Sequence, residues 1–157
     1  MSDLAKLRAE HAALIEIARR LSAIIAEPQP PSAAELFAVR GELASVLIGH
    51  LKAEDWVLYP RLFASPDPAV EQTARAFSDE MGHLAEAYGA HTQKWTASSI
   101  AADWAGYCRE TGVILDALGK RIIRENRELY PLLEAMDKAA CAECSGGTVK
   151  AGTPATA

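Results

Sequence analysis

Two stretches of the chain share a spacing of side chains that bind metal ions in proteins. In the first, H-L-K-A-E-D-W-V-L-Y-P, His50 and Glu54 are four residues apart. The second, R-I-I-R-E-N-R-E-L-Y-P, repeats this layout with Arg121 in place of the histidine and Glu125 in place of Glu54. Residues four apart on a helix lie one above the other on the same face. Imidazole and carboxylate groups placed in this way suit iron or manganese, so the pattern indicates a metal site.

The elements that carry these residues are predicted to be helices. Apolar residues recur at spacings of three and four, and His11 stands where the first helix would otherwise carry an apolar residue. Ser32 and Glu35 form a capping box at the start of the second helix. Polar, proline-containing turns separate the helices expected over residues 4–26, 32–63, 69–95 and 99–138. Four long helices joined by short turns predict an all-α, up-down-up-down four-helix bundle, built here from a duplicated helical hairpin.

The same repeat places four polar positions in one layer of the bundle. In antiparallel helices, residues equidistant from a turn face each other. His11, His50, His83 and Arg121 are equidistant from the turns expected near residues 30, 67 and 100. A single buried histidine is commonly satisfied by a carbonyl group, but burying several polar groups together is costly unless they have partners. Three histidines and two glutamates in one layer therefore favour a metal, of the kind that bundles hold as a pair of iron or manganese ions.

Length and composition set the limits on other functions. The 157 residues form one domain, expected over residues 1–139, followed by a flexible tail over residues 140–157. A net charge of -5 gives no basic surface for nucleic acid. No apolar run is long enough to span a membrane, and no signal peptide is expected.

The cysteines indicate a reducing environment. Cys108, Cys141 and Cys144 are too few for a disulfide framework, so a cytoplasmic protein is expected. Cys141 and Cys144 form a C-A-E-C pair in the expected tail. Two thiolates make a weak metal motif because a zinc site needs four ligands. We therefore expect this pair to be incidental.

The chain resembles the hemerythrin-like family, the bundles called HHE cation-binding domains, over roughly residues 4–137. The twice-used layout that ends in L-Y-P carries the resemblance, together with the histidines in R-A-E-H and E-M-G-H. The resemblance implies a non-haem di-iron centre bridged by two glutamates. It also implies roles in binding or sensing dioxygen, in iron handling, or in responses to nitric oxide or oxidative stress. The metal ligands expected on this basis are His11, His50, Glu54, His83 and Glu125.

Arg121 departs from the family pattern, because it stands where the family places a metal-binding histidine. Arginine stays protonated and has no lone pair for a metal. Three outcomes stay open: one ion with Arg121 standing in for the second, a strained two-ion site, or no ion and salt bridges from Arg121 to Glu54 and Glu125. Asp79 and Glu80 are candidate substitute ligands.

The leading functional interpretation is a non-catalytic iron-binding protein that senses or handles iron, dioxygen or a related ligand such as nitric oxide. Such a protein needs a protein partner or a second copy of itself to pass on a signal. One alternative is a metal-free scaffold, and another is a di-iron redox or nitric-oxide repair factor. An enzymatic role is the less favoured reading, because redox chemistry is easier with two irons than with one.

Four residues near the expected site are predicted not to bind the metal. Tyr59 and Tyr130 repeat with the motif, and we expect each to lie at a helix end with an exposed hydroxyl group. His91 is expected at the surface or at a helix end, since it lies too far along its helix from His83 to share a metal. Glu10 is expected to face solvent or a neighbouring helix rather than the metal.

Overall fold

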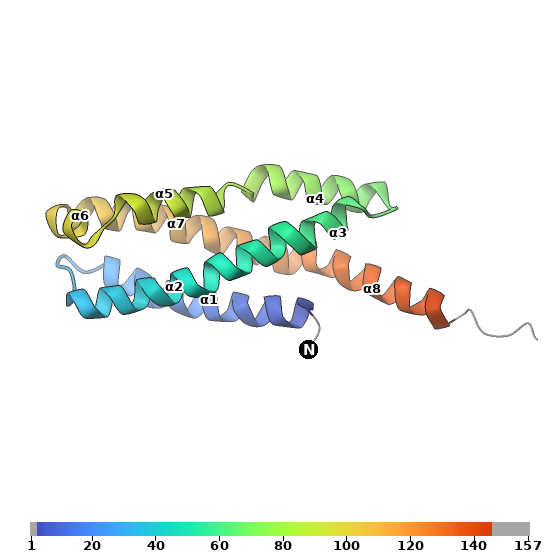
Figure 1. Cartoon of the computed structure of the whole chain (residues 1–157), viewed down its shortest axis with the longest axis horizontal. Coiled ribbons are helices and arrows are strands. Elements are labelled where there is room, and N and C mark those ends of the chain that lie inside the picture. Colours follow the sequence, from blue (N-terminus) through green and yellow to red (C-terminus); the bar gives the residue numbers. More distant parts are fainter. Residues whose placement is uncertain (1–2, 146–157) are drawn as a thin grey trace, which may run out of the picture.

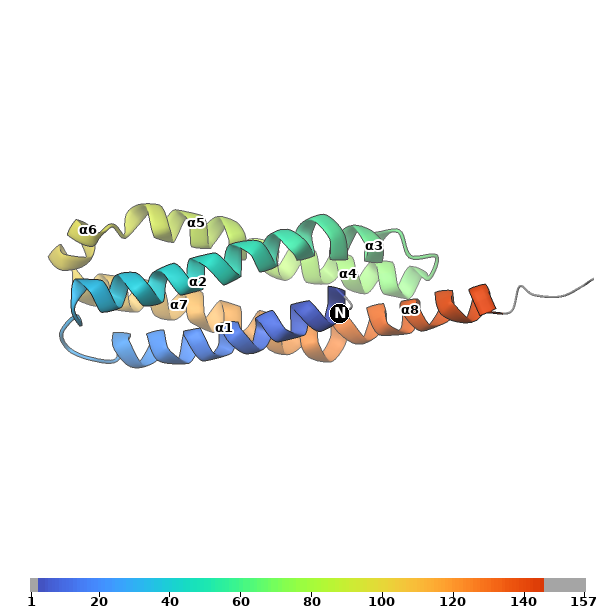
Figure 2. The same ribbon diagram turned by 60° about the horizontal axis from the view of Figure 1, so that its bottom comes forward.

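The computed structural model describes residues 3–145, and the side chains of residues 3–142. Its helices form four long arms that run alternately in opposite directions, side by side (Figures 1 and 2). The first arm is α1 (Asp3–Ile25), and the second joins α2 (Ala33–Ala53), η1 (Glu54–Leu58) and α3 (Tyr59–Phe63). The third joins α4 (Pro68–Met81) and α5 (Leu84–Lys94), and the short α6 (Ala97–Ala102) follows it. The fourth joins α7 (Trp104–Arg124), η2 (Glu125–Leu129) and α8 (Tyr130–Ser145).

This arrangement confirms the predicted all-α bundle. Within residues 3–145 there is no strand, and no helix is long and apolar enough to cross a membrane. The predicted cap at Ser32 is also confirmed, because its hydroxyl oxygen accepts a hydrogen bond from the Glu35 backbone N–H at 3.2 Å. The fourth arm is longer than predicted, since α8 continues past Lys138 to Ser145. The rest of the predicted tail, residues 146–157, lies outside the described residues.

The second and fourth arms each contain one π turn where the sequence repeat predicts a bend. η1 begins at Glu54 and η2 begins at Glu125, and a Tyr-Pro pair follows each turn. The backbone N–H of Tyr59 bonds to the carbonyl of Glu54, five residues back, and Tyr130 bonds to Glu125 in the same way. Proline lacks the N–H that a regular helix needs, and the π turn accommodates this defect without ending the helix. The prediction that the two prolines bend or end their helices is therefore only partly right.

The third arm is interrupted near its middle. α4 ends at Met81, and Gly82 and His83 form a turn before α5 begins. A side chain at position 82 would place its Cβ 2.4 Å from the Ser78 carbonyl oxygen, so the close turn requires glycine. The prediction of one continuous helix over residues 69–95 is wrong at this point.

A layer of polar side chains divides the apolar core of the bundle into two parts. One cluster of buried residues includes Leu14, Leu47 and Leu118, and lies toward α5 and α6. The other includes Leu62, Leu129 and Tyr130, and lies toward α3 and α4. Between them lie buried histidine, glutamate and arginine side chains from α1 and from the second and fourth arms: His11, His50, Glu54, Arg121 and Glu125.

Candidate metal centre

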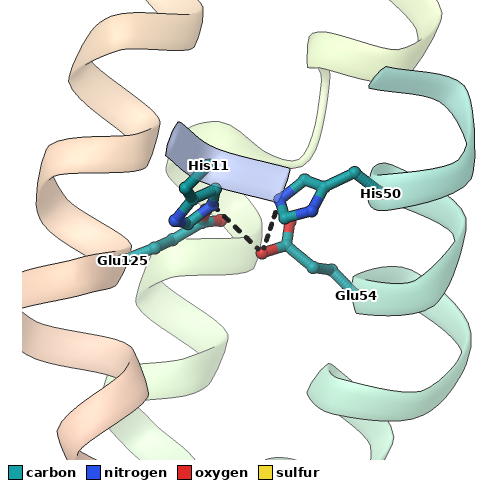
Figure 3. Close-up of side chains that lie close together, drawn as sticks. All are labelled: His11, His50, Glu54 and Glu125. Atoms are coloured by element: carbon teal, nitrogen blue, oxygen red, sulfur yellow. Dashed lines mark ion pairs between the residues drawn. The ribbon is translucent and has the colours of Figure 1, made fainter. Parts of the chain in front are cut away.

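Four of the five predicted metal ligands meet in this layer. His11 comes from α1, His50 from α2, Glu54 from the start of η1 and Glu125 from the start of η2. Figure 3 shows the four side chains pointing toward one another. Each offers one ligand atom, and these atoms all lie within 4.8 Å of one another. We call this group the central cluster, and its four side chains are at most 2% exposed.

The inward-facing atoms of the central cluster are two imidazole nitrogens and two carboxylate oxygens. His50 Nε2 lies 3.3 Å from Glu54 Oε1, and His11 Nε2 lies 3.2 Å from Glu125 Oε2. The two imidazole rings are 4.6 Å apart between centroids. These separations bring four metal-ligand atoms from three helical arms to one point in the core.

The outer nitrogen of each imidazole has an acceptor that fixes its tautomer. His50 Nδ1 lies 2.9 Å from Glu10 Oε2, and a carboxylate can only accept, so Nδ1 carries the proton. His11 Nδ1 lies 3.0 Å from Asn126 Oδ1. The same amide oxygen faces a guanidinium N–H of Arg8 at 3.4 Å, which supports its assignment as the oxygen. A ring that carries its only proton on Nδ1 directs the Nε2 lone pair into the central cluster.

Arg121 binds the outer oxygens of both glutamates. Its Nη2 donates to Glu54 Oε2 and its Nε donates to Glu125 Oε1, each at 2.7 Å. Its Nη1 donates to the carbonyl of Met81 at 3.1 Å, at the interruption between α4 and α5. The side chain is 2% exposed. One guanidinium thus holds both carboxylates and joins the third arm to the layer.

Two tyrosines add hydroxyl groups to the layer. The Tyr130 hydroxyl donates to Glu54 Oε1 at 2.7 Å and also lies 3.1 Å from His11 Nε2, with its ring stacked on the His11 ring. The Tyr59 hydroxyl lies 3.5 Å from Glu125 Oε1. Both tyrosines are buried, so the prediction of exposed hydroxyl groups is wrong. The π turns explain the difference: each brings the tyrosine under the glutamate five residues earlier, on the inward face.

Burial and charge act in opposite directions on the titratable groups of the layer. Burial disfavours the charged form of Glu54, but contacts with His50 and Arg121 outweigh it and lower its pKa to about 2. Burial raises the pKa of Glu125, and the charge of Glu54 adds to this. Burial also disfavours the charged form of His50, but the contact with Glu54 outweighs it and raises the pKa of His50. The carboxyl groups of Glu54 and Glu125, whose pKa values are shifted in opposite directions, therefore share the single guanidinium of Arg121.

The central cluster fits one metal ion. Two of its inward atoms, His50 Nε2 and Glu125 Oε2, are buried without a hydrogen-bond partner in the described protein. An unpaired buried polar atom costs about 1–3 kcal/mol, so natural proteins rarely leave two in one place. A cation bound between the imidazoles and carboxylates would satisfy both atoms.

Among the described residues, no second group of three or more possible metal ligands accompanies the central cluster. The predicted fifth ligand, His83, is exposed at the interruption of the third arm and lies outside the central cluster. The prediction that it faces the interior is wrong because the helix breaks just before it. Asp79 and Glu80 are exposed as well, and Glu80 binds Arg124 instead. The position of the missing histidine ligand is filled by the guanidinium of Arg121.

Sequence reasoning missed several residues around the site. Asn126 follows a glutamate in an ordinary helical sequence, so no pattern marks it. The repeat did mark Tyr130, but only the π turn reveals which way it faces. His91, expected at the surface or at a helix end, lies in the last turn of α5; it is 9% exposed, and its Nε2 lies 3.0 Å from the Thr111 hydroxyl oxygen, well away from the central cluster.

The sequence was compared with known families and proteins. The family description "Hemerythrin HHE cation binding domain" matches residues 2–133, which is most of the chain. Neither the curated proteins nor the solved structures give a match. The match covers the first three arms, the fourth arm as far as residue 133, and each residue of the central cluster.

Proposed function

Because the chain belongs to the hemerythrin HHE cation-binding domain family, we propose that it binds a single iron ion through His11, His50, Glu54 and Glu125. The observation that carries the proposal is a pair of buried ligand atoms without a hydrogen bond, His50 Nε2 and Glu125 Oε2, which lie 3.3 and 3.2 Å from atoms of the other two ligands. Two imidazoles and two carboxylates suit iron among the available metals. An iron ion held there supplies a Lewis-acidic centre capable of one-electron redox change.

Arg121 takes the place of a second ion in this proposal. A guanidinium carries one positive charge and binds carboxylate oxygens in a fixed planar arrangement. By holding Glu54 Oε2 and Glu125 Oε1, it leaves the other oxygen of each glutamate directed at the imidazoles. Each glutamate would then have one oxygen free to bind an ion.

A single ion favours iron handling, or the sensing of dioxygen or a related small ligand such as nitric oxide, over redox chemistry that needs two irons. A sensing role requires a protein partner or a second copy of the chain to receive the signal. The cytoplasm is the compartment we propose, since three cysteines are too few for a disulfide framework.

A second candidate function is a metal-free scaffold. The hydrogen bonds from Arg121 to both glutamates favour it, because they already neutralise much of the buried negative charge. The scaffold leaves His50 Nε2 and Glu125 Oε2 unsatisfied, and this is why we prefer the metal-binding function.

Variants of two histidines separate these functions. Protein purified without a metal-affinity tag is loaded anaerobically with ferrous iron, desalted, and analysed for iron per chain. We expect wild type and the exposed control His83→Ala to hold about one iron, and His50→Ala to hold far less. Equal iron contents in all three proteins would show that the iron binds elsewhere. No iron in wild type would favour the scaffold.

A further inference from the structure

The two imidazoles of the central cluster have outer partners of different charge. The acceptor at His50 Nδ1 is the carboxylate of Glu10, and the acceptor at His11 Nδ1 is the neutral amide of Asn126. Both partners come from positions without any metal-binding pattern in the sequence. Glu10 immediately precedes His11 on α1, and Asn126 immediately follows Glu125 in η2. Each therefore reaches the histidine of a different arm.

An acceptor on the outer nitrogen changes what the inner nitrogen can do. It holds the proton on Nδ1, leaves the lone pair on Nε2, and fixes the orientation of the ring. A carboxylate acceptor also draws the proton toward itself and makes the imidazole a stronger electron-pair donor than an amide acceptor does. Because Glu10 is charged and Asn126 is neutral, His50 should bind a metal more strongly than His11 does.

Each outer partner also has a basic neighbour. The Glu10 carboxylate lies 3.8 Å from the Lys6 ammonium group in the same helix. Asn126 accepts from Arg8, whose other terminal nitrogen donates to Glu134 at 2.8 Å. Glu10 also lines a cavity of about 480 Å³ between α1, the second arm and α8, and its side chain is 23% exposed. It therefore lies between the His50 N–H and the space of this cavity.

We propose that Glu10 and Asn126 are positioning residues that commit both imidazoles to binding the ion through Nε2, and that Glu10 makes His50 the stronger nitrogen ligand. This inference rests on the proposed function and adds the residues that set the affinity of the site. Neither residue contacts the ion; each acts through the ring to which it is hydrogen-bonded.

The test measures metal affinity in full-length variants, with cobalt(II) as the probe and a chelator as competitor. Changing an outer partner of a metal-binding histidine costs about 10–100-fold in affinity. We expect Glu10→Gln, which keeps an acceptor but loses the charge, to bind about 10-fold more weakly than wild type. Glu10→Ala, which loses the acceptor, should bind about 100-fold more weakly. Glu10→Asp should recover much of the loss, and Asn126→Asp should bind more tightly than wild type.

The matched control is Glu16→Gln, the same change on the exposed side of α1, where the carboxylate pairs with Arg19. It should bind cobalt(II) as wild type does. Unfolding of each metal-free variant by urea shows whether a loss of affinity reflects a loss of folded protein.

Proton NMR of the cobalt-loaded proteins gives a readout that a general packing role would not change. Two coordinated imidazoles with protonated Nδ1 atoms give two strongly shifted N–H signals that vanish in deuterated water. In Glu10→Ala the His50 signal should be lost through exchange with water from the cavity, while the His11 signal stays.

The outcomes separate this inference from the proposed function. If wild type binds cobalt(II) and Glu10→Gln binds it equally well, with both N–H signals unmoved, the positioning roles are wrong and the metal site stands. If wild type itself binds no metal, the proposed function fails and the positioning roles fail with it.

Discussion

Replacing Arg121 by methionine tests whether its guanidinium holds the metal-free layer together. Methionine has a similar length and no charge, so it fills the space and leaves Glu54 and Glu125 facing each other without a cation. The lost contacts are two charge-assisted hydrogen bonds of 2.7 Å between side chains that are at most 2% exposed. Removing one partner from a buried ionic group costs about 3–5 kcal/mol. We expect Arg121→Met to lower the free energy of unfolding of the metal-free protein by this amount.

Urea unfolding in the presence of a chelator, followed by circular dichroism, measures the change. Arg121→Lys serves as the control: it keeps the charge but cannot bind both carboxylates at once, and should fall between wild type and Arg121→Met. Excess zinc should recover part of the loss in Arg121→Met, because the ion supplies positive charge to the same carboxylates. If the unfolding free energy of Arg121→Met, measured with the chelator present, is within about 0.5 kcal/mol of that of wild type, Arg121 does not stabilise the layer and the reasoning fails.

Three further changes test individual contacts. Tyr130→Phe removes the hydroxyl donor to Glu54 and should lower the free energy of unfolding in urea by about 1–3 kcal/mol. An unchanged midpoint of urea unfolding would show that this hydroxyl does not stabilise the fold. Burial lowers the pKa of His91 in the folded protein. As the pH falls below about 6.5, this histidine therefore binds a proton more readily in the unfolded chain than in the folded one. Wild type should therefore lose stability from this pH downward relative to His91→Gln, and parallel stability curves between pH 8 and 5.5 would contradict this. Ser32→Ala removes the cap on the Glu35 N–H and should cost about 1 kcal/mol in thermal or urea unfolding; no loss would place the start of α2 elsewhere.

The arms of the bundle could be predicted from the sequence because apolar spacing and helix caps are local signals. Antiparallel pairing then placed His11 opposite His50, and the structure puts their rings 4.6 Å apart. Arg121 also lies in the predicted layer, where it donates hydrogen bonds to both glutamates. These successes depend on regular helices, in which distance along the chain determines position in space.

The errors occur where a helix departs from regular geometry. Gly82 allows α4 to end, and the interruption turns His83 outward, although the counting of residues places it in the layer. The π turns rotate Tyr59 and Tyr130 inward, and helical periodicity gives no sign of the extra residue in each turn. Glu10 faces a neighbouring helix as predicted, but its contact with the His50 imidazole was not predicted, because an acidic residue beside a ligand has the same sequence signature whether it faces solvent or a second imidazole.

The number of iron ions bound per chain tests the central claim most directly. Anaerobic titration of the chelator-treated wild type with ferrous iron, followed by desalting and elemental analysis, gives this number. Our account predicts a plateau at about one iron per chain, because the central cluster supplies one set of ligands and Arg121 occupies the place of the second ion. A plateau at about two would show that Arg121 and His83 move to admit a second ion, and a value near zero would show that the layer is held by its salt bridges alone.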